Sequence, residues 1–195
     1  MISVIIPYLK DRGYLNEAIE SVVLQTYPYH ELLLESGGTQ GANINNALKR
    51  AKGEYIKILH DDDILPPNSL KDLREGIEGY DWVCGDAESF GEERFCDPQV
   101  YEGRVPDFQR MIEENEVYGG TTLYRKEIVR YDEDLWTGEE YDFHLRLLKN
   151  GYRCNYIPKV VHNYRLHEFN KSYYMGPGEK KERREFIRCI AEKYR

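Results

Sequence analysis

The sequence lacks several features by which common protein classes are recognised. Its four cysteines, at positions 84, 96, 154 and 189, are widely separated, and no two have the C-x-x-C spacing of a zinc or redox site. No apolar run approaches the roughly 18 residues that a membrane span requires. The chain also opens on a strand-like segment without a charged leader. These absences predict a cytoplasmic protein with reduced thiols and no transmembrane segment.

Basic charge is also scarce. The 195 residues include 27 Lys and Arg against 35 Asp and Glu, so the net charge is −8. Because a nucleic-acid-binding protein needs a basic surface, we expect no nucleic-acid partner. The acidic excess lies in residues 1–170, whereas residues 171–195 have a basic balance. With 41% hydrophobic residues, the chain is able to form a core, and its length fits one domain.

Familiar catalytic motifs are missing as well. The sequence contains neither the phosphate-loop pattern G-x-x-x-x-G-K-[ST] nor the nucleophile elbow G-x-S-x-G. The glycine-containing segment 35–41 is too short and wrongly ordered for a dinucleotide fingerprint. The sequence therefore disfavours phosphate-loop nucleoside triphosphatases, α/β-hydrolases and typical dinucleotide-binding enzymes.

What is present is a regular alternation of strand and helix patterns in the first 60 residues. Residues 2–7 are β-branched and apolar, as in a strand that is buried on both faces. Apolar residues recur at helical spacing over 14–25 and again over 42–51. Short strands are predicted at 30–34 and 55–59. This order predicts an α/β fold with a mostly parallel sheet flanked by helices, in which ligands bind beyond the carboxyl ends of the strands.

The rest of the chain has less regular patterns. Helices are predicted at about 68–78, near 108–112, at 139–150 and in the C-terminal segment. Strands are predicted at 82–84, 121–125, 152–156 and 160–165. Residues 87–106 have no clear period, so we expect a loop or hairpin there.

Three consecutive carboxylates, Asp61, Asp62 and Asp63, follow the strand predicted at 55–59. Adjacent carboxylates repel one another, so their pKa values rise unless the loop is well solvated or a cation is bound. A hard divalent cation relieves the repulsion and often shares its coordination shell with substrate phosphates. The residues alone leave two interpretations open, a solvated acidic turn and a metal site.

A second acidic segment surrounds Glu139, Glu140 and Asp142 at the predicted start of a helix. Acids there interact favourably with the helix dipole, and Asp142 is spaced to pair with Arg146. The functional alternative is that one carboxylate faces a cleft and acts as a general base.

A cluster of Arg165, His167 and Lys171 follows the last predicted strand, in an otherwise acidic part of the chain. Such cations suit a diphosphate, and Mn²⁺ accepts an imidazole ligand. A histidine taken alone is more often structural.

Seven short segments, in this order, resemble the family 2 glycosyltransferases of the GT-A fold. They lie at 3–8, 15–28, 46–56, 61–66, 119–121, 138–142 and 164–167. The likeness spans about residues 1–172. It implies the GT-A (nucleotide-diphospho-sugar transferase) fold with a Rossmann-like N-terminal half. On this interpretation, residues 1–65 form a nucleotide-binding half, residues 66–172 an acceptor and catalytic half, and residues 173–195 an amphipathic helix.

The resemblance further implies a metal-dependent enzyme of glycan biosynthesis. It would move a hexosyl or deoxyhexosyl group from a nucleotide-diphosphate donor, with a UDP-sugar favoured, to a hydroxyl of a glycan or glycoconjugate. The expected cofactor is Mn²⁺ or Mg²⁺. We expect inversion of the anomeric centre, because a base candidate is present and no separate nucleophile is evident.

Two alternatives to this enzyme remain open. One is a catalytically reduced nucleotide-sugar-binding module of a larger assembly, in which the segment 173–195 would contact a partner domain or a membrane surface. The other is a sugar nucleotidyltransferase. The second is disfavoured because no glycine-rich basic loop follows the first strand.

The resemblance also implies roles for individual residues. Donor-binding residues are Pro7, Tyr8, Glu35, Asp61, Asp62, Arg165 and Lys171, with Glu35 in the place of an Asp that contacts the base. The metal ligands implied are Asp62, Asp63 and His167, although the division of roles among the three aspartates is open. Glu140 is the implied catalytic base, and Glu139 is a second candidate.

Overall fold

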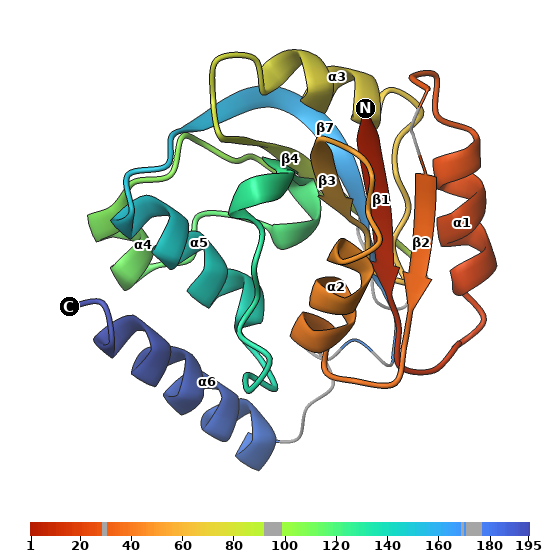
Figure 1. The fold of residues 1–195 in the computed structure, drawn as a ribbon. Helices are drawn as coiled ribbons and strands as arrows, with labels where there is room; N and C mark the ends of the chain where they lie inside the picture. The colour runs from red at the N-terminus through yellow and green to blue at the C-terminus, as the bar shows by residue number, and fades with distance from the viewer. Residues whose placement is uncertain (29–30, 92–98, 169, 171–176) are drawn as a thin grey trace.

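The first half of the chain forms three parallel strands. A computed structural model describes residues 1–28, 31–91, 99–168, 170 and 177–195, and Figure 1 shows its fold. The strands are β1 (Ile2–Pro7), β2 (Glu31–Glu35) and β3 (Tyr55–Ile58), joined through the helices α1 (Leu15–Val23) and α2 (Gln40–Leu48). Both β2 and β3 pair in parallel with β1. The predicted β-α-β-α-β alternation is thus confirmed.

The second half completes a seven-stranded mixed sheet. Its elements are α3 (Ser69–Gly76), β4 (Trp82–Gly91), β5 (Val100–Tyr101), α4 (Phe108–Glu113), β6 (Thr122–Arg125), α5 (Glu139–Lys149), β7 (Cys154–Leu166) and α6 (Pro177–Glu192). The strand order is β2-β1-β3-β6-β4, with β5 and β7 also paired to β4. Only β5 and β6 run antiparallel to the other described strands. Consequently β6 begins at the edge where the parallel strands end.

Two strands are longer than the sequence predicted. β4 continues through Gly91, and the two strands expected at 152–156 and 160–165 form the single strand β7. The pairing of β7 with β4 is irregular between Tyr156 and Val160, around Pro158. Proline is tolerated there because a bulge near a sheet edge does not need its missing N–H group.

The sheet has a hydrophobic core on each face. On one face, Ile2, Val4 and Ile6 of β1 pack with residues of α1 and α3. On the other, Ile5 packs within a cluster that includes residues of α2, α4, α5 and α6, and Figure 1 shows α2 and α5 in front of the sheet. The alternation of side chains along β1 therefore supplies both cores, as expected for a strand buried on both faces.

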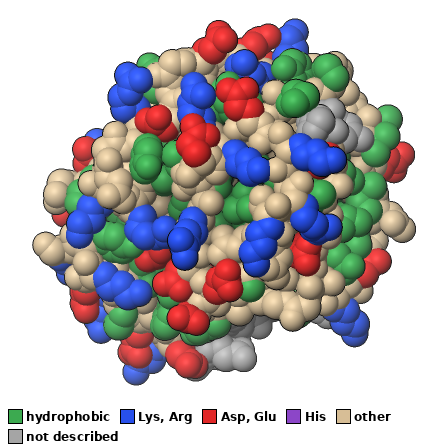
Figure 2. Space-filling view, in the orientation of Figure 1, with side chains coloured by type: hydrophobic (Ala, Val, Ile, Leu, Met, Phe, Trp, Pro, Cys, Tyr) green, Lys and Arg blue, Asp and Glu red, His purple; other side chains and the backbone are tan. Residues whose placement is uncertain are grey.

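The C-terminal helix α6 packs on its own domain. Ile190 and Ala191 are buried, and the Tyr194 hydroxyl just after the helix donates to Asp142 Oδ1 at 2.7 Å. No helix in the described ranges combines the length and apolar character needed to cross a membrane. On the face drawn in Figure 2, acidic and basic side chains are interspersed, so the acidic excess is not gathered into one patch there.

Candidate active site

A cavity of 930 Å³ opens at the carboxyl edge of the parallel strands. Its walls come from the end of β1, the start of α2, the loop after β3, the entrance to β6, the start of α5, β7 and α6. The polar and charged lining residues include Tyr8, Arg12, Gln40, Asn43, His60, Asp61, Asp62, Asp63, Tyr118, Glu139, Glu140, His162, Asn170 and Arg183. Elements distant in sequence meet here, as the rule for open α/β sheets predicts.

Asp63 is the anchor of the loop that follows β3. Its side chain is fully buried, Oδ2 lies 2.9 Å from His162 Nε2, and Oδ1 accepts a 2.8 Å hydrogen bond from the backbone N–H of Arg165. Burial opposes the charged form, but the rings of His162 and His60 outweigh it and hold the pKa of Asp63 well below its usual range. The loop is also tied to β7 by paired backbone hydrogen bonds between Ile64 and Asn163.

Asp62, in the same loop, contacts His167, which directly follows β7. Asp62 Oδ2 lies 3.1 Å from His167 Nε2; the Asp62 side chain is partly exposed and the His167 side chain is buried. Neighbouring Asp61 lines the cavity, and burial together with the charge of Asp62 raises the pKa of Asp61 to about 6. The repulsion expected between adjacent carboxylates is therefore present in this loop.

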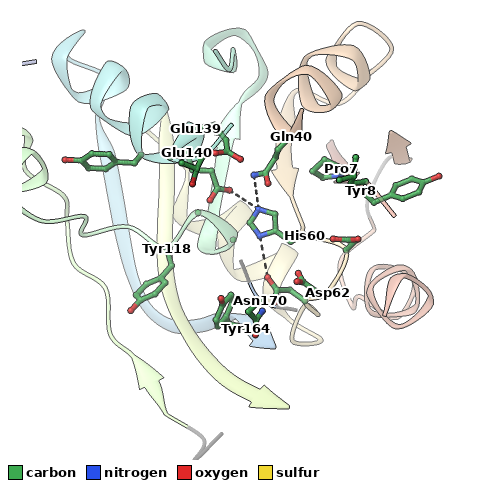
Figure 3. Close-up of a pocket in the computed structure, with 18 of the residues that line it drawn as sticks. Pro7, Tyr8, Gln40, His60, Asp62, Tyr118, Glu139, Glu140, Tyr164 and Asn170 are labelled. Carbon is green, nitrogen blue, oxygen red and sulfur yellow. Dashed lines mark hydrogen bonds and ion pairs between the residues drawn. The ribbon is translucent and has the colours of Figure 1, made fainter. Parts of the chain in front are cut away.

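His60 links this loop to the start of α5. Its Nε2 lies 3.2 Å from Glu140 Oε1 and 3.1 Å from Gln40 Nε2, and its Nδ1 lies 3.5 Å from Asp63 Oδ2. Figure 3 shows Glu140 and Gln40 beside the His60 ring, each joined to it by a dashed line. Burial disfavours the imidazolium, but Glu140 and Asp63 outweigh it and raise the pKa of His60 well above its usual value.

Glu140 occupies the first turn of α5, where it faces the cavity. The helix begins after Gly138, whose φ of +73° is a conformation that favours glycine. Burial favours a protonated Glu140, but His60 and, to a smaller degree, His144 and His162 outweigh it and lower the pKa of Glu140. Glu140 is therefore ionised at neutral pH, as a proton acceptor must be.

The glycine pair before β6 lets the backbone approach this carboxylate closely. A Cβ added at Gly119 would lie 2.0 Å from Glu140 Oε2, and one at Gly120 would lie 2.3 Å from the His162 ring. Beneath the pair, the fully buried Lys57 of β3 donates to the Gly120 carbonyl. The antiparallel entrance of β6 thus forms one wall of the site.

The structure brings most of the predicted site residues together. Pro7, Tyr8, the three aspartates 61–63, Glu139 and Glu140 all line the cavity. Their roles in catalysis and binding remain predictions.

Three predicted donor and metal residues do not line the cavity. Glu35 pairs with Arg50, and the buried His167 contacts Asp62, which lines the cavity. Arg165 is buried, with Nε on the Asp62 carbonyl and Nη2 on Glu17 Oε2, each at 2.7 Å. Lys171, also predicted to bind the donor, lies outside the described residues.

Several lining residues were not predicted from the sequence. Gln40 and Asn43 come from the first turn of α2, which begins two residues earlier than expected. Asn43 bridges the Tyr8 and Gly38 carbonyls at 3.4 and 3.3 Å. Trp136 and Arg183 also line the cavity. The amphipathic pattern of the C-terminal segment was the available signal for Arg183, but a pattern alone does not say which cavity a helix borders.

Within the described ranges, no group of three or more His, Cys, Asp or Glu residues is arranged to hold a metal ion. The side chains of Asp62 and His167 are the donor set suited to a metal ion that protein and substrate coordinate together. Two ligands about 2.1 Å from one octahedral ion, at a right angle, are roughly 3 Å apart, which matches the separation of these two atoms. The chemistry of the pair would suit a divalent ion whose remaining ligands would be substrate phosphate or water. Asp63 fits less well, because both of its oxygens already have protein partners.

Solved structures with the same fold include two of S. aureus TarS 1-349. The structure in complex with UDP-GlcNAc superposes with a TM-score of 0.71 at 20% identity, over 97% of this chain and 66% of that one. The structure in complex with UDP gives a TM-score of 0.67 at 20% identity, over 86% and 61%. This likeness concerns the fold.

Curated relatives are similar in sequence over part of their length. The uncharacterized glycosyltransferase MJ1057 of Methanocaldococcus jannaschii is 27% identical over 136 residues, which is 65% of this chain and 47% of that protein. The uncharacterized glycosyltransferase RT0329 of Rickettsia typhi is 23% identical over 188 residues, which is 76% of this chain and 59% of that protein. The chain thus spans about half the length of these relatives.

The sequence model described as glycosyl transferase family 2 matches residues 32–132. The matched segment runs from β2 through the aspartate loop and the Gly119–Gly120 pair to the loop before α5. The resemblance predicted from seven short segments is therefore confirmed. The chain belongs to the family 2 glycosyltransferases and has their GT-A fold.

Proposed function

We propose that this chain transfers a sugar from a UDP-sugar donor to an acceptor hydroxyl, with inversion, and that Glu140 is the general base. The observation that carries the proposal is the position of Glu140. Its ionised carboxylate lines the same cavity as the aspartate loop and is held against His60. A direct displacement at an anomeric carbon requires a base near the acceptor hydroxyl and a site for the leaving diphosphate in the same cavity.

The donor would lie along the carboxyl edge of β1 and β3. Pro7 and Tyr8 end β1, and Asp61 and Asp62 follow β3, in a cavity large enough for a nucleotide sugar. Two TarS structures with the same fold carry UDP and UDP-GlcNAc. The ligands of these two structures support a UDP-sugar as the donor.

A divalent cation, Mn²⁺ or Mg²⁺, is part of the proposal. Asp62 and His167 would hold it, and when bound it would neutralise charge on the leaving diphosphate. Asp63 would instead position the loop through His162 and the Arg165 N–H group. This division assigns separate tasks to two neighbouring aspartates.

In the proposed reaction, Glu140 accepts the proton of the acceptor hydroxyl as that oxygen bonds to the anomeric carbon. The bond from that carbon to the diphosphate oxygen breaks in the same step, and the nucleoside diphosphate leaves. A single displacement inverts the centre. General-base help of this kind contributes about 10²–10⁴-fold in rate.

The test replaces Glu140 by Gln, which keeps the size of the side chain and removes its basicity. We expect Glu140→Gln to lose about 10²–10⁴-fold in transfer from a UDP-sugar to a panel of acceptors, with UDP affinity by calorimetry close to that of the native protein. Glu139→Gln, one residue earlier in the same helical turn, is the matched control. Normal turnover by Glu140→Gln together with inactivity of Glu139→Gln would transfer the role of base to Glu139.

A second candidate function follows from the short span of the chain relative to its relatives. The chain would then bind the nucleotide sugar, and another segment or partner would complete the acceptor site. Native protein that binds UDP but transfers sugar to no member of the panel would favour this binding module over the enzyme.

A further inference from the structure

Arg183 brings a guanidinium from α6 into the cavity wall. Its Nε donates a 3.0 Å hydrogen bond to Thr137 Oγ1, and Thr137 is buried. This bond holds the guanidinium beside the loop that leads into Glu139 and Glu140. Because Arg carries five N–H donors and this bond uses one of them, the guanidinium has further donors for a ligand in the cavity.

No carboxylate in the described part of the chain forms an ion pair with Arg183, although other arginines of this protein do, such as Arg146 with Asp142 and Arg188 with Glu192. A partly buried guanidinium that lines a cavity, and that has no anionic partner among the described residues, is suited to bind an oxyanion there.

The position of Arg183 separates it from the donor edge. The other arginine among the described lining residues is Arg12, whose charge acts on Asp61. Arg183 instead contacts the residue three positions before Glu140. In the proposed reaction the acceptor approaches the base, so Arg183 lies on the acceptor side.

An apolar surface adjoins this guanidinium. The half-exposed Trp136 lines the cavity and packs on Phe186 of α6, with ring centroids 5.5 Å apart. Ile187 of the same helix also lines the cavity. Apolar lining from Trp136 and Ile187 in the same cavity wall as a guanidinium matches a molecule with an apolar ring face and an anionic substituent.

We propose that the Trp136–Gly138 loop and α6 form an acceptor subsite for a saccharide that carries an oxyanion, and that Arg183 recognises the oxyanion. The inference rests on the proposed function and deepens it by naming the acceptor class. The planar guanidinium suits both phosphate and carboxylate in a bidentate contact. Arg183 lies outside the segment 32–132 that matches the family model, so the chain's own C-terminal helix sets this specificity.

Ligand-observed NMR in the presence of saturating UDP tests the proposal. The probes are glucose, glucose 6-phosphate and glucuronic acid, which share a ring and differ in charge. We expect at least one charged probe to bind the native protein more tightly than glucose. Arg183→Ala should weaken that probe about tenfold, the size expected for losing one charge-assisted hydrogen bond. The charged probe that binds more tightly distinguishes a phosphate from a carboxylate acceptor.

Arg184→Ala is the matched control, because Arg184 is the next residue of α6, is exposed and does not line the cavity. It should bind the charged probe as the native protein does. The proposal is overturned if the three probes bind alike, if none binds, or if both variants weaken the charged probe equally. UDP affinity, measured separately by calorimetry, should be the same in all three proteins. If the native protein does not bind UDP, the proposed function itself fails, which is a different result.

Discussion

At the scale of single residues, Lys57 is the most unusual feature of the sheet. It lies in the middle of β3, is fully buried and donates to the Gly120 carbonyl below the glycine pair. Burial lowers the pKa of Lys57 to about 7, although Glu140 and Asp63 act in the opposite direction. A cation inside the sheet thus supports the backbone that Glu140 packs against.

The depressed pKa of Lys57 predicts a pH-dependent stability. Above pH 7 the folded lysine loses its proton, whereas the unfolded lysine keeps it up to its ordinary pKa of 10.5. The unfolded state then binds more protons, so the contribution of Lys57 to the free energy of unfolding rises with pH from 7 to about 10. Relative to Lys57→Met, the native protein should gain up to about 1.4 kcal/mol per pH unit in this range.

Urea denaturation of both proteins at pH 7, 8 and 9 measures this difference. Lys71→Met, at an exposed position of α3, should keep the pH dependence of the native protein. Parallel curves for native protein and Lys57→Met would show that the buried lysine does not titrate in this range.

At the scale of elements, the packing of α6 against α5 forms one side of the cavity. Gly138, at the start of α5, leaves room for Ile190, because an added Cβ there would lie 2.8 Å from Ile190 Cδ1. The Tyr194 hydroxyl secures the end of the chain to Asp142. The helix therefore holds the loop before Glu140 as well as presenting Arg183.

Ile190→Ala tests whether α6 is an integral part of the domain. Ile190 is 1% exposed, and an isoleucine truncated in a well-packed core costs about 2–5 kcal/mol of unfolding free energy. Leu24→Ala, at a position that is 65% exposed, should cost less than about 0.5 kcal/mol. If denaturant titrations gave the same small loss of unfolding free energy for Ile190→Ala and Leu24→Ala, α6 would not be packed on the domain in solution.

At the scale of the whole molecule, the acidic excess and an anionic donor have to be reconciled. Asp61, Asp62, Glu139 and Glu140 line the cavity in which a diphosphate would bind. In the proposed function a divalent cation on Asp62 and His167 offsets this charge. Donor affinity should therefore depend on the metal.

A thermal-shift measurement checks this dependence. UDP at about 100 times its dissociation constant should add about 2.7 kcal/mol of stability, or roughly 5–10 °C in Tm for a chain of this size. The shift should be larger with Mn²⁺ than with EDTA, and Asp62→Asn should reduce the difference. Equal shifts under both conditions would contradict the metal site and leave donor binding intact, whereas no shift would contradict the donor.

The amino-acid sequence was sufficient to predict the layered fold, the edge of the sheet that carries the site and the family. The fold and the edge follow from local patterns, because apolar periodicity places strands and helices and the direction of parallel strands brings their carboxyl ends together. The family follows from the resemblance of seven short segments to the family 2 glycosyltransferases. Asp61 to Asp63 were predicted at the site because they follow a strand with a clear pattern and because the family resemblance implies it, and Glu140 was predicted as the base from that resemblance. Two strands were predicted around Pro158 because proline usually ends a strand. The structure has the single strand β7 there, which continues past Pro158 through a bulge.

The contacts between side chains, in contrast, follow from the tertiary packing. Asp63 meets His162, 99 positions away, while Asp62 meets His167, so adjacent and identical residues have different partners. Glu35 turns to Arg50, and α6 brings Arg183 to Thr137. The partner of a charged group is set by the distant segment that packs beside it, and this packing has no signature in the local sequence.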